Sequence, residues 1–276
     1  MTLQSCLAYA LTLVLVGGAR AQDVAPPLEE DGSTDQTRLA GQAGGTWSSG
    51  NSTSVSLNFQ LRVSHRRKND QLTWNGLVNY ARARSQALGA GPDGEVQTYE
   101  SDSLYYTRLR YDRFFRERNT FFVAALAFRD ESSGFRFRYS PYAGYQRTWI
   151  ATKSFEAWTD LGYRYARESL LLDRRARREG FPTQRSVHGP LAALGLEAKL
   201  NETLDFDLVF EAQQALNLSG DFRVFGVASL TNQIGKGFSL GTNFGLRYHH
   251  GPIGDRAPLD TQLQLIALLE YTIEPR

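Results

Sequence analysis

The chain of 276 residues has one cysteine, one methionine and no apolar run long enough to form a membrane-spanning helix. A single thiol, Cys6, cannot build a disulfide framework or a cysteine-ligated zinc site. A spanning helix needs about 20 consecutive apolar residues, so helical membrane spans are excluded. Lysine and arginine number 31 against 29 acidic residues. This balance argues against a nucleic-acid partner, which a large excess of positive charge would favour.

The N-terminus is typical of an exported protein. An uncharged apolar run from Leu7 to Val16 precedes Ala19-Arg20-Ala21, which fits a small-residue cleavage site. We therefore predict a signal peptide over residues 1–21. Residues 22–38 contain Pro26-Pro27 and an acidic stretch but almost no apolar side chains, and we predict a disordered acidic periplasmic tail there.

From residue 39 onward, apolar and polar residues alternate with period two, which is the pattern of β-strands. Leu57, Phe59 and Leu61, for example, are separated by Asn58 and Gln60. Aromatic residues are many and prolines few, and both features favour strands. We predict twelve strands, at 39–47, 53–65, 70–83, 97–114, 119–130, 134–150, 154–171, 187–200, 204–216, 221–234, 238–249 and 259–273.

The lengths of the strands and of their connections predict a membrane barrel. Most strands reach the roughly nine to eleven residues that cross a bilayer, and their even number is usual for single-chain outer-membrane barrels. Short connections alternate with longer ones, as periplasmic turns alternate with extracellular loops. The predicted fold class is all-β, a twelve-stranded antiparallel transmembrane β-barrel over residues 39–276. It lies in the bacterial outer membrane with both termini in the periplasm, and the first strand pairs with the last.

The two phases of the alternation predict which side chains face lipid. The apolar phase should point outward: Val55, Leu57, Phe59, Leu61, Leu263, Leu265 and Ala267. The other phase carries acidic and basic residues in near-equal numbers, which favours ion pairs across the lumen. We predict a lumen charge network of Arg62, Arg108, Arg110, Arg136, Arg138, Glu197, Lys199, Asp205, Asp207 and Glu211.

One hairpin has a register that can be predicted. Opposed residues must share a face, so Lys199 should lie opposite Asp205, and Glu197 opposite Asp207, across a three-residue loop, 201–203. Two opposed carboxylates repel each other, so we expect Lys199 or a lumen arginine to bridge them.

Several short motifs resemble a known family. They include Ser49-Gly50-Asn51-Ser52, the basic turn Arg66-Arg67-Lys68-Asn69-Asp70 and Tyr111-Asp112-Arg113-Phe114-Phe115, followed by Gly144-Tyr145 and Leu161-Gly162-Tyr163-Arg164. In this order they resemble the YdiY-like salt-induced outer-membrane proteins, domain-of-unknown-function family 481, over roughly residues 41–273. The resemblance implies an outer-membrane β-barrel without catalytic residues to carry over. The chain departs from the pattern in its acidic tail, its arginine-rich loop and its Glu274-Pro275-Arg276 end.

Candidate chemical groups are few. Asp205 and Asp207 share one face and could perform acid/base chemistry, but pairing with Lys199 and lumen arginines is the simpler interpretation. His249 and His250 are adjacent on a strand, so they point to opposite faces and make a poor metal pair. We therefore expect no catalytic residues, no metal and no cofactor.

A long loop carries a cluster of arginines, Arg174, Arg175, Arg177 and Arg178. On an extracellular loop these side chains could contact the phosphates of lipopolysaccharide, although a solvated loop explains them as well. The expected partners are outer-membrane lipid, lipopolysaccharide and the barrel-assembly machinery. The predicted function is a narrow passive channel or a structural envelope component. The alternatives are an outer-membrane enzyme acting on lipid or peptide, and a secreted soluble β-barrel that binds a small ligand.

Overall fold

The structure is a computed structural model that describes residues 35–48, 52–86, 96–99, 103–130, 134–172, 180, 182–250 and 258–273. Its strands are β1 (Asp35–Ser48), β2 (Ser52–Arg67), β3 (Asp70–Gln86), β4 (Val96–Tyr99), β5 (Ser103–Phe114), β6 (Asn119–Asp130), β7 (Phe135–Ala151), β8 (Phe155–Leu170), β9 (Gln184–Lys199), β10 (Leu204–Gln214), β11 (Phe222–Gly235), β12 (Phe238–His250) and β13 (Leu259–Ile273). No helix among these residues is long and apolar enough to cross a membrane.

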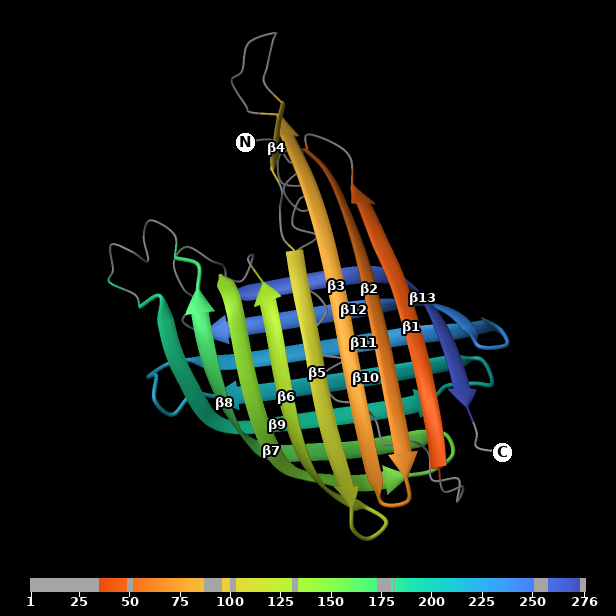
Figure 1. Cartoon of the computed structure of the whole chain (residues 1–276). Coiled ribbons are helices and arrows are strands. Elements are labelled where there is room, and N and C mark those ends of the chain that lie inside the picture. Colours follow the sequence, from red (N-terminus) through yellow and green to blue (C-terminus); the bar gives the residue numbers. More distant parts are fainter. Residues whose placement is uncertain are drawn as a thin grey trace, which may run out of the picture.

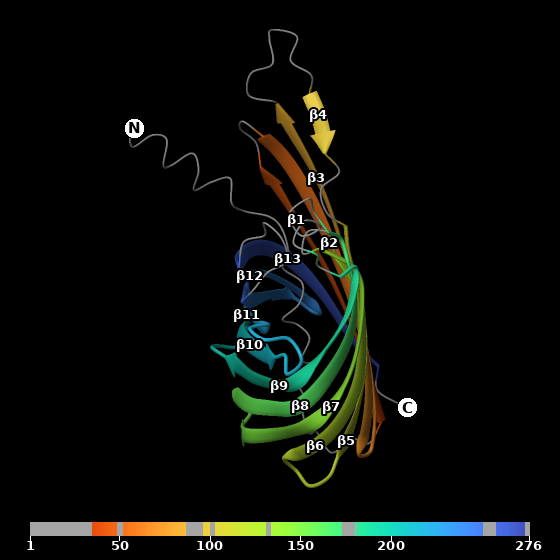
Figure 2. The ribbon, with the colours of Figure 1, turned by 90° about the vertical axis from the view of Figure 1, so that its left-hand side faces the viewer.

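Twelve of the strands form a closed antiparallel barrel. Neighbours in sequence pair with each other, and β1 pairs with β13 from Thr37↔Ile273 to Gly45↔Leu265. This pairing confirms the predicted closure of the first strand on the last. The strands are strongly tilted, so the wall of β1–β3 and β5 crosses the wall of β9–β12 steeply in Figure 1. The side view shows the interior between the two walls (Figure 2).

The segment 97–114, predicted as one strand, is two strands, and this prediction was wrong. β4 pairs only with the end of β3, from Ala83↔Tyr99 to Gln86↔Val96, whereas β5 pairs with β3 and β6 in the barrel. The hairpin of β3 and β4 therefore extends beyond the barrel rim (Figure 2). In the sequence, Glu100 and Asp102 continue the even-numbered polar phase of Arg108 and Arg110, which conceals the break between the two strands. β1 also begins at Asp35, four residues before the predicted start.

The two ends of the barrel differ. At one end, here the turn end, the connections are short: 68–69, 115–118, 152–154, 200–203 and 236–237. The described start of β1 and the described end of β13 lie at the turn end, because both strands pair there with each other. The opposite end, here the loop end, carries the remaining connections. The predicted signal peptide and most of the predicted tail lie outside the described residues.

The outer wall is apolar and the interior is polar. Leu57, Phe59, Leu61, Leu263 and Leu265 are exposed, while Ser56, Asn58 and Gln264 between them are buried. Ala267 is half-buried, and the side chain of Val55 lies outside the described residues. A soluble barrel would show polar side chains to water, so the soluble alternative is wrong. The fold is a transmembrane barrel, since exposed apolar side chains match lipid and closure leaves no unpaired strand edge within the barrel wall.

Arg136 does not follow its predicted facing. It is exposed, whereas Phe135 and Arg138 are buried. The pairing of β7 with β8 shifts register between Phe135 and Phe137, so a β-bulge inserts one residue at this point. A bulge changes the phase of the alternation, and it removes Arg136 from the interior.

The hairpin of β9 and β10 has the predicted register. Asp205 lies opposite Lys199, Asp207 opposite Glu197, and the loop closes with the amide of Leu200 donating to the carbonyl of Leu204 at 2.8 Å. Asn201 stabilises the loop because its side-chain oxygen accepts hydrogen bonds from the amides of Thr203 and Leu204, each at 2.9 Å.

Candidate functional site

Charged side chains fill the interior near the loop end. The carboxylate of Glu168, on β8, lies 2.7 Å from Arg185, 2.7 Å from Arg223 and 3.4 Å from Arg138. These four side chains come from four different strands, β7, β8, β9 and β11. Because Glu168 is fully buried, its charge is compensated by arginines rather than by water.

Asp221, in the loop that precedes β11, extends this cluster. Its carboxylate lies 2.7 Å from Arg223, 3.2 Å from Arg185 and 3.2 Å from Nε2 of His249. Burial alone would raise the pKa of Asp221, but hydrogen bonds with His249 and Arg223 hold that pKa well below its usual range. Asp130 on β6 also pairs at this level with Arg247 on β12, at 3.2 Å.

A second group of ion pairs lies deeper in the interior. Arg110 contacts Asp112 and Asp160, both at 2.8 Å, and donates to Gln146 at 2.6 Å. Arg164 pairs with both carboxylate oxygens of Glu211, the longer contact being 3.1 Å. Each guanidinium also lies over an aromatic ring: Arg110 is 4.1 Å from the centre of Phe122, and Arg164 is 4.5 Å from that of Tyr142. Of the residues predicted for the lumen network, Arg108, Arg110, Arg138 and Glu211 are buried and Arg62 is half-buried.

Three neighbouring interior side chains have polar atoms without hydrogen-bond partners. Arg62, Asn75 and Arg108 lie side by side on β2, β3 and β5. Among the described residues, the buried Nε of Arg62, all three guanidinium nitrogens of Arg108 and both amide atoms of Asn75 have no hydrogen-bond partner. Arg108 is only 1% exposed. An unsatisfied buried polar group costs about 1–3 kcal/mol, so these atoms call for hydrogen-bond partners other than the described side chains.

A cavity of about 200 Å³ lies in the turn-end half of the interior. One side of its wall carries Arg38 and Arg62, from β1 and β2, and another carries Glu197 and Asp207, from β9 and β10. Its remaining lining consists of small polar and aliphatic side chains together with Trp158 and Glu270: Ala40, Gln42, Gln60, Ser64, Leu196, Val209, Val227, Ser229, Thr231, Asn243, Ile266 and Leu268.

The expected bridge between Glu197 and Asp207 is absent, and this prediction was wrong. Lys199 is exposed at the turn end, and among the described residues no cation lies within 4.0 Å of either carboxylate. Arg62 acts on both carboxylates electrostatically from across the cavity. The reason is geometric: Lys199 lies opposite Asp205, one row closer to the rim than Asp207.

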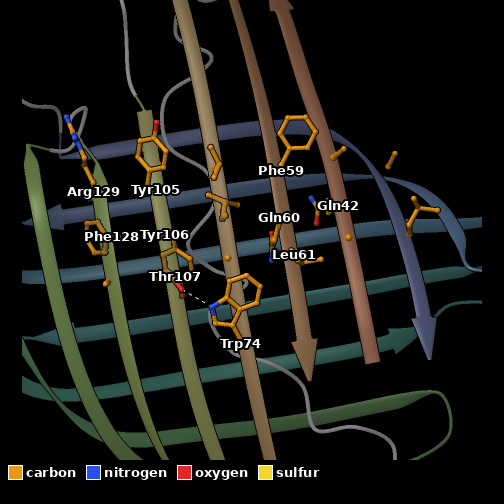
Figure 3. Close-up of a pocket in the computed structure, with 18 of the residues that line it drawn as sticks. Gln42, Phe59, Gln60, Leu61, Trp74, Tyr105, Tyr106, Thr107, Phe128 and Arg129 are labelled. Carbon is orange, nitrogen blue, oxygen red and sulfur yellow. Dashed lines mark hydrogen bonds between the residues drawn. The ribbon is translucent and has the colours of Figure 1, made fainter. Parts of the chain in front are cut away.

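A larger hollow of about 720 Å³ lies on the outer wall, over β1–β3, β5 and β6. Figure 3 shows Phe59, Trp74 and Tyr105 around it, all of them exposed. The indole ring of Trp74 covers Gly76, where a Cβ atom would be 2.8 Å from the ring, and its Nε1 donates to Thr107 at 3.0 Å. Because this wall faces lipid and the lining is mostly apolar, with Arg129 as the charged residue among the lining residues described, lipid acyl chains fit this hollow better than a polar solute.

The remaining candidate residues from the sequence do not form a site among the described residues. His249 contacts Asp221 and His250 is exposed, and no three His, Cys, Asp or Glu side chains in the described part of the chain are grouped closely enough to hold a metal. Arg174, Arg175, Arg177 and Arg178 lie outside the described residues. From the sequence, Trp158 was not identified as an interior residue. Its alternation in phase with Glu156 and Asp160, which face the interior, would have indicated this position.

Comparisons with known proteins place the chain in a family. The family described as "Protein of unknown function, DUF481" matches residues 41–272. The chain belongs to this family. The match confirms the family that the motifs predicted. This DUF481 member is an outer-membrane β-barrel, as its closed antiparallel sheet and apolar outer wall require. A comparison with the curated proteins found no match.

Solved structures with a similar fold include outer-membrane barrels of several kinds. The NanC porin has 12% identity and a TM-score of 0.46, over 86% of this chain and 100% of that chain. The translocator domain of the autotransporter NalP from Neisseria meningitidis has 10% identity and a TM-score of 0.46, over 97% of both chains. A deletion mutant of the TodX monoaromatic hydrocarbon channel has 10% identity and a TM-score of 0.44, over 92% of both chains. Because these TM-scores are below 0.5, the function of the DUF481 member has to be argued from its own residues.

Proposed function

We propose that this barrel is a narrow passive channel for small polar solutes, with a charge-paired lumen. The observation that carries the proposal is the set of buried polar atoms without protein partners. It extends from Asn243 and Trp158 at the turn-end cavity, through Arg108 and Asn75, to Gln213. A barrel that served only as a scaffold would gain stability by pairing or replacing these groups, whereas a water-filled path satisfies them.

The ion pairs at the loop end make the proposed path narrow. Asp130 and Arg247 form an ion pair across the interior, and Glu168 forms ion pairs with arginines from three other strands. Twelve strands enclose less space than the sixteen to eighteen of wide aqueous porins, so long side chains can reach one another. Since charges of both signs are present, the channel should discriminate weakly between anions and cations.

The orientation and the partners are part of the proposal. Short turns of outer-membrane barrels lie in the periplasm, so the turn end, with both described chain ends, is proposed to be periplasmic. The loop end is then extracellular. Arg174, Arg175, Arg177 and Arg178 would lie there and contact lipopolysaccharide phosphates.

Conductance of the purified full chain in planar bilayers tests the channel. We expect small, weakly ion-selective currents from the wild type. The double variant Asp130→Ala/Arg247→Ala should carry larger currents, because it removes the pair that crosses the lumen. Glu202→Ala, in an exposed turn, is the matched control and should behave as the wild type. Heat-modifiable migration on gels verifies folding of each protein.

A structural envelope component is the second candidate, and a specific observation favours it. Trp158, Arg108 and Arg110 are large side chains that are fully buried in the interior. If the folded wild type and the folded double variant both remain silent in bilayers, the channel proposal is wrong and the structural role stands.

A further inference from the structure

The turn-end cavity contains charges that lack partners within the protein. Arg38 is the exception, because its Nε forms an ion pair with Glu270 at 3.1 Å. Arg62, Glu197 and Asp207 have no ion pair within 4.0 Å among the described residues, although they line the same cavity. All three side chains are half-buried, and a charge withdrawn from water without a partner is costly, so one guanidinium facing two carboxylates calls for a compensating group.

The two carboxylates lie close to each other. Glu197 and Asp207 are directly opposed on β9 and β10, and Glu156 lies opposite Glu197 on β8. Opposed like charges are destabilising unless a cation is shared between them. A metal ion does not fit, since no three acidic or histidine side chains in the described part of the barrel are grouped closely enough. An ammonium group does fit, because it has three N–H donors to divide between the carboxylates.

Two further polar atoms in the cavity lining lack hydrogen bonds. Nε1 of Trp158 and Oδ1 of Asn243 have no partner among the described residues, although the side chains are only 0% and 6% exposed. Trp158 lies directly over Gly195, where a Cβ atom would be 2.0 Å from the indole ring. The cavity thus offers a donor, Trp158, and an acceptor, Asn243, in addition to its charges.

We propose that this cavity binds a small zwitterion that carries one anionic and one ammonium group, such as an α-amino acid. The anionic group contacts Arg62, and the ammonium group lies between Glu197 and Asp207. The aliphatic side chains of Val209, Val227 and Ile266 line the space left for a small apolar substituent. The volume of about 200 Å³ equals about seven waters at the ~30 Å³ of liquid water, which suits a solute of this size. The inference rests on the proposed channel function, for which it names the class of solute.

The test uses three probes that differ only in their charged groups. L-valine carries both, 3-methylbutanoate lacks the ammonium group, and 2-methylpropylamine lacks the carboxylate. Saturation-transfer NMR on the folded full chain in detergent micelles measures their binding. We expect L-valine to bind with a dissociation constant about tenfold lower than that of either analogue, because each analogue loses one charge-assisted contact. Equal binding of all three probes, or no binding of L-valine, would overturn the site.

Variants test whether the anionic group of the ligand contacts Arg62 and its ammonium group contacts Asp207. Arg62→Gln should weaken L-valine binding about tenfold and leave 2-methylpropylamine unaffected. Asp207→Asn should weaken L-valine and leave 3-methylbutanoate unaffected. Lys153→Gln and Glu202→Gln change exposed turn residues in the same way and should alter nothing. If Arg62→Gln fails to fold, Asp207→Asn and the three wild-type titrations still decide the matter.

The experiment also separates the site from the channel. Binding of L-valine to a folded protein that carries no current contradicts the proposed channel and leaves the site intact. Current through a folded protein that does not bind L-valine keeps the channel and overturns the site.

Discussion

Asp130 and Arg247 form an ion pair of 3.2 Å across the barrel interior, although they belong to opposite walls. Five barrel strands separate β6 from β12 in either direction around the ring. The pair therefore spans the barrel, whereas an ion pair such as that of Arg113 with Asp70, at 2.6 Å, joins the neighbouring strands β5 and β3. Because Asp130 is 2% exposed, this contact is screened little by solvent and holds the two walls together.

A double-mutant cycle should measure this connection. We expect Asp130→Asn and Arg247→Gln each to lower the free energy of unfolding by about 1–3 kcal/mol, because each removes a charge-assisted contact across the interior. The double variant should lose less than the sum of the two. Urea unfolding in lipid vesicles, followed by heat-modifiable gel migration, gives the values. Additive losses would mean that the two residues do not interact in the folded barrel.

Glu168 should be more sensitive than any exposed carboxylate. It holds Arg138, Arg185 and Arg223, so Glu168→Gln leaves three guanidinium groups close together without their shared anion. We expect a loss of about 3–5 kcal/mol in the free energy of unfolding. Glu202→Gln, in the turn between β9 and β10, is the matched control and should change it by less than about 0.5 kcal/mol. A wild-type unfolding midpoint for Glu168→Gln would rule out this role.

Strand positions and facing could be predicted because each depends on nearest neighbours in the chain. The alternation of Leu57, Phe59 and Leu61 determines which face meets lipid, and parity determines that Asp205 lies opposite Lys199. The two misjudged places, β4 and Arg136, are a break in a strand and a bulge. Neither disturbs the local pattern of residues strongly enough to be seen in the sequence.

The candidate site could be predicted only in part, for a physical reason. Inward facing of Arg62, Glu197 and Asp207 follows from the alternation, but which of them meet across the interior depends on strand tilt and barrel closure. The pairing of Arg164 with Glu211 and the cavity beside Trp158 depend on these distances. Gly195 permits the indole of Trp158 to lie against β9, a close approach that periodicity does not encode.

Asp221 should make stability depend on acid pH. Its folded-state pKa is lowered by His249 and Arg223 despite burial, so the folded protein binds this proton less readily than the unfolded chain. The resulting stability is present above the unfolded pKa of about 3.9 and is lost as the pH falls below it. We expect the wild type to lose more stability than Asp221→Asn between about pH 5 and pH 3.

Urea titrations of both proteins across this range measure the difference. Carboxylates that share no partner with Asp221, such as Asp160 and Glu211, have the same surroundings in both proteins, so their contribution cancels. Parallel pH profiles would show that Asp221 contributes nothing to the acid response. A steeper profile for the variant would show that its folded-state pKa is raised and not lowered.

Depth in the membrane should decide the cost of a charge on the outer wall. Leu265 and Leu259 are both exposed on β13, but Leu265 lies near the middle of the strand and Leu259 at its loop-end start. Arginine costs about 2–4 kcal/mol at the bilayer midplane and about 0–1 near the interface, where it reaches water. We therefore expect Leu265→Arg to lower the free energy of unfolding in lipid vesicles much more than Leu259→Arg. Both proteins gain the same charge at the same phase of the same strand, so burial inside the barrel cannot produce the difference. Equal costs at the two positions would contradict a transmembrane placement of β13.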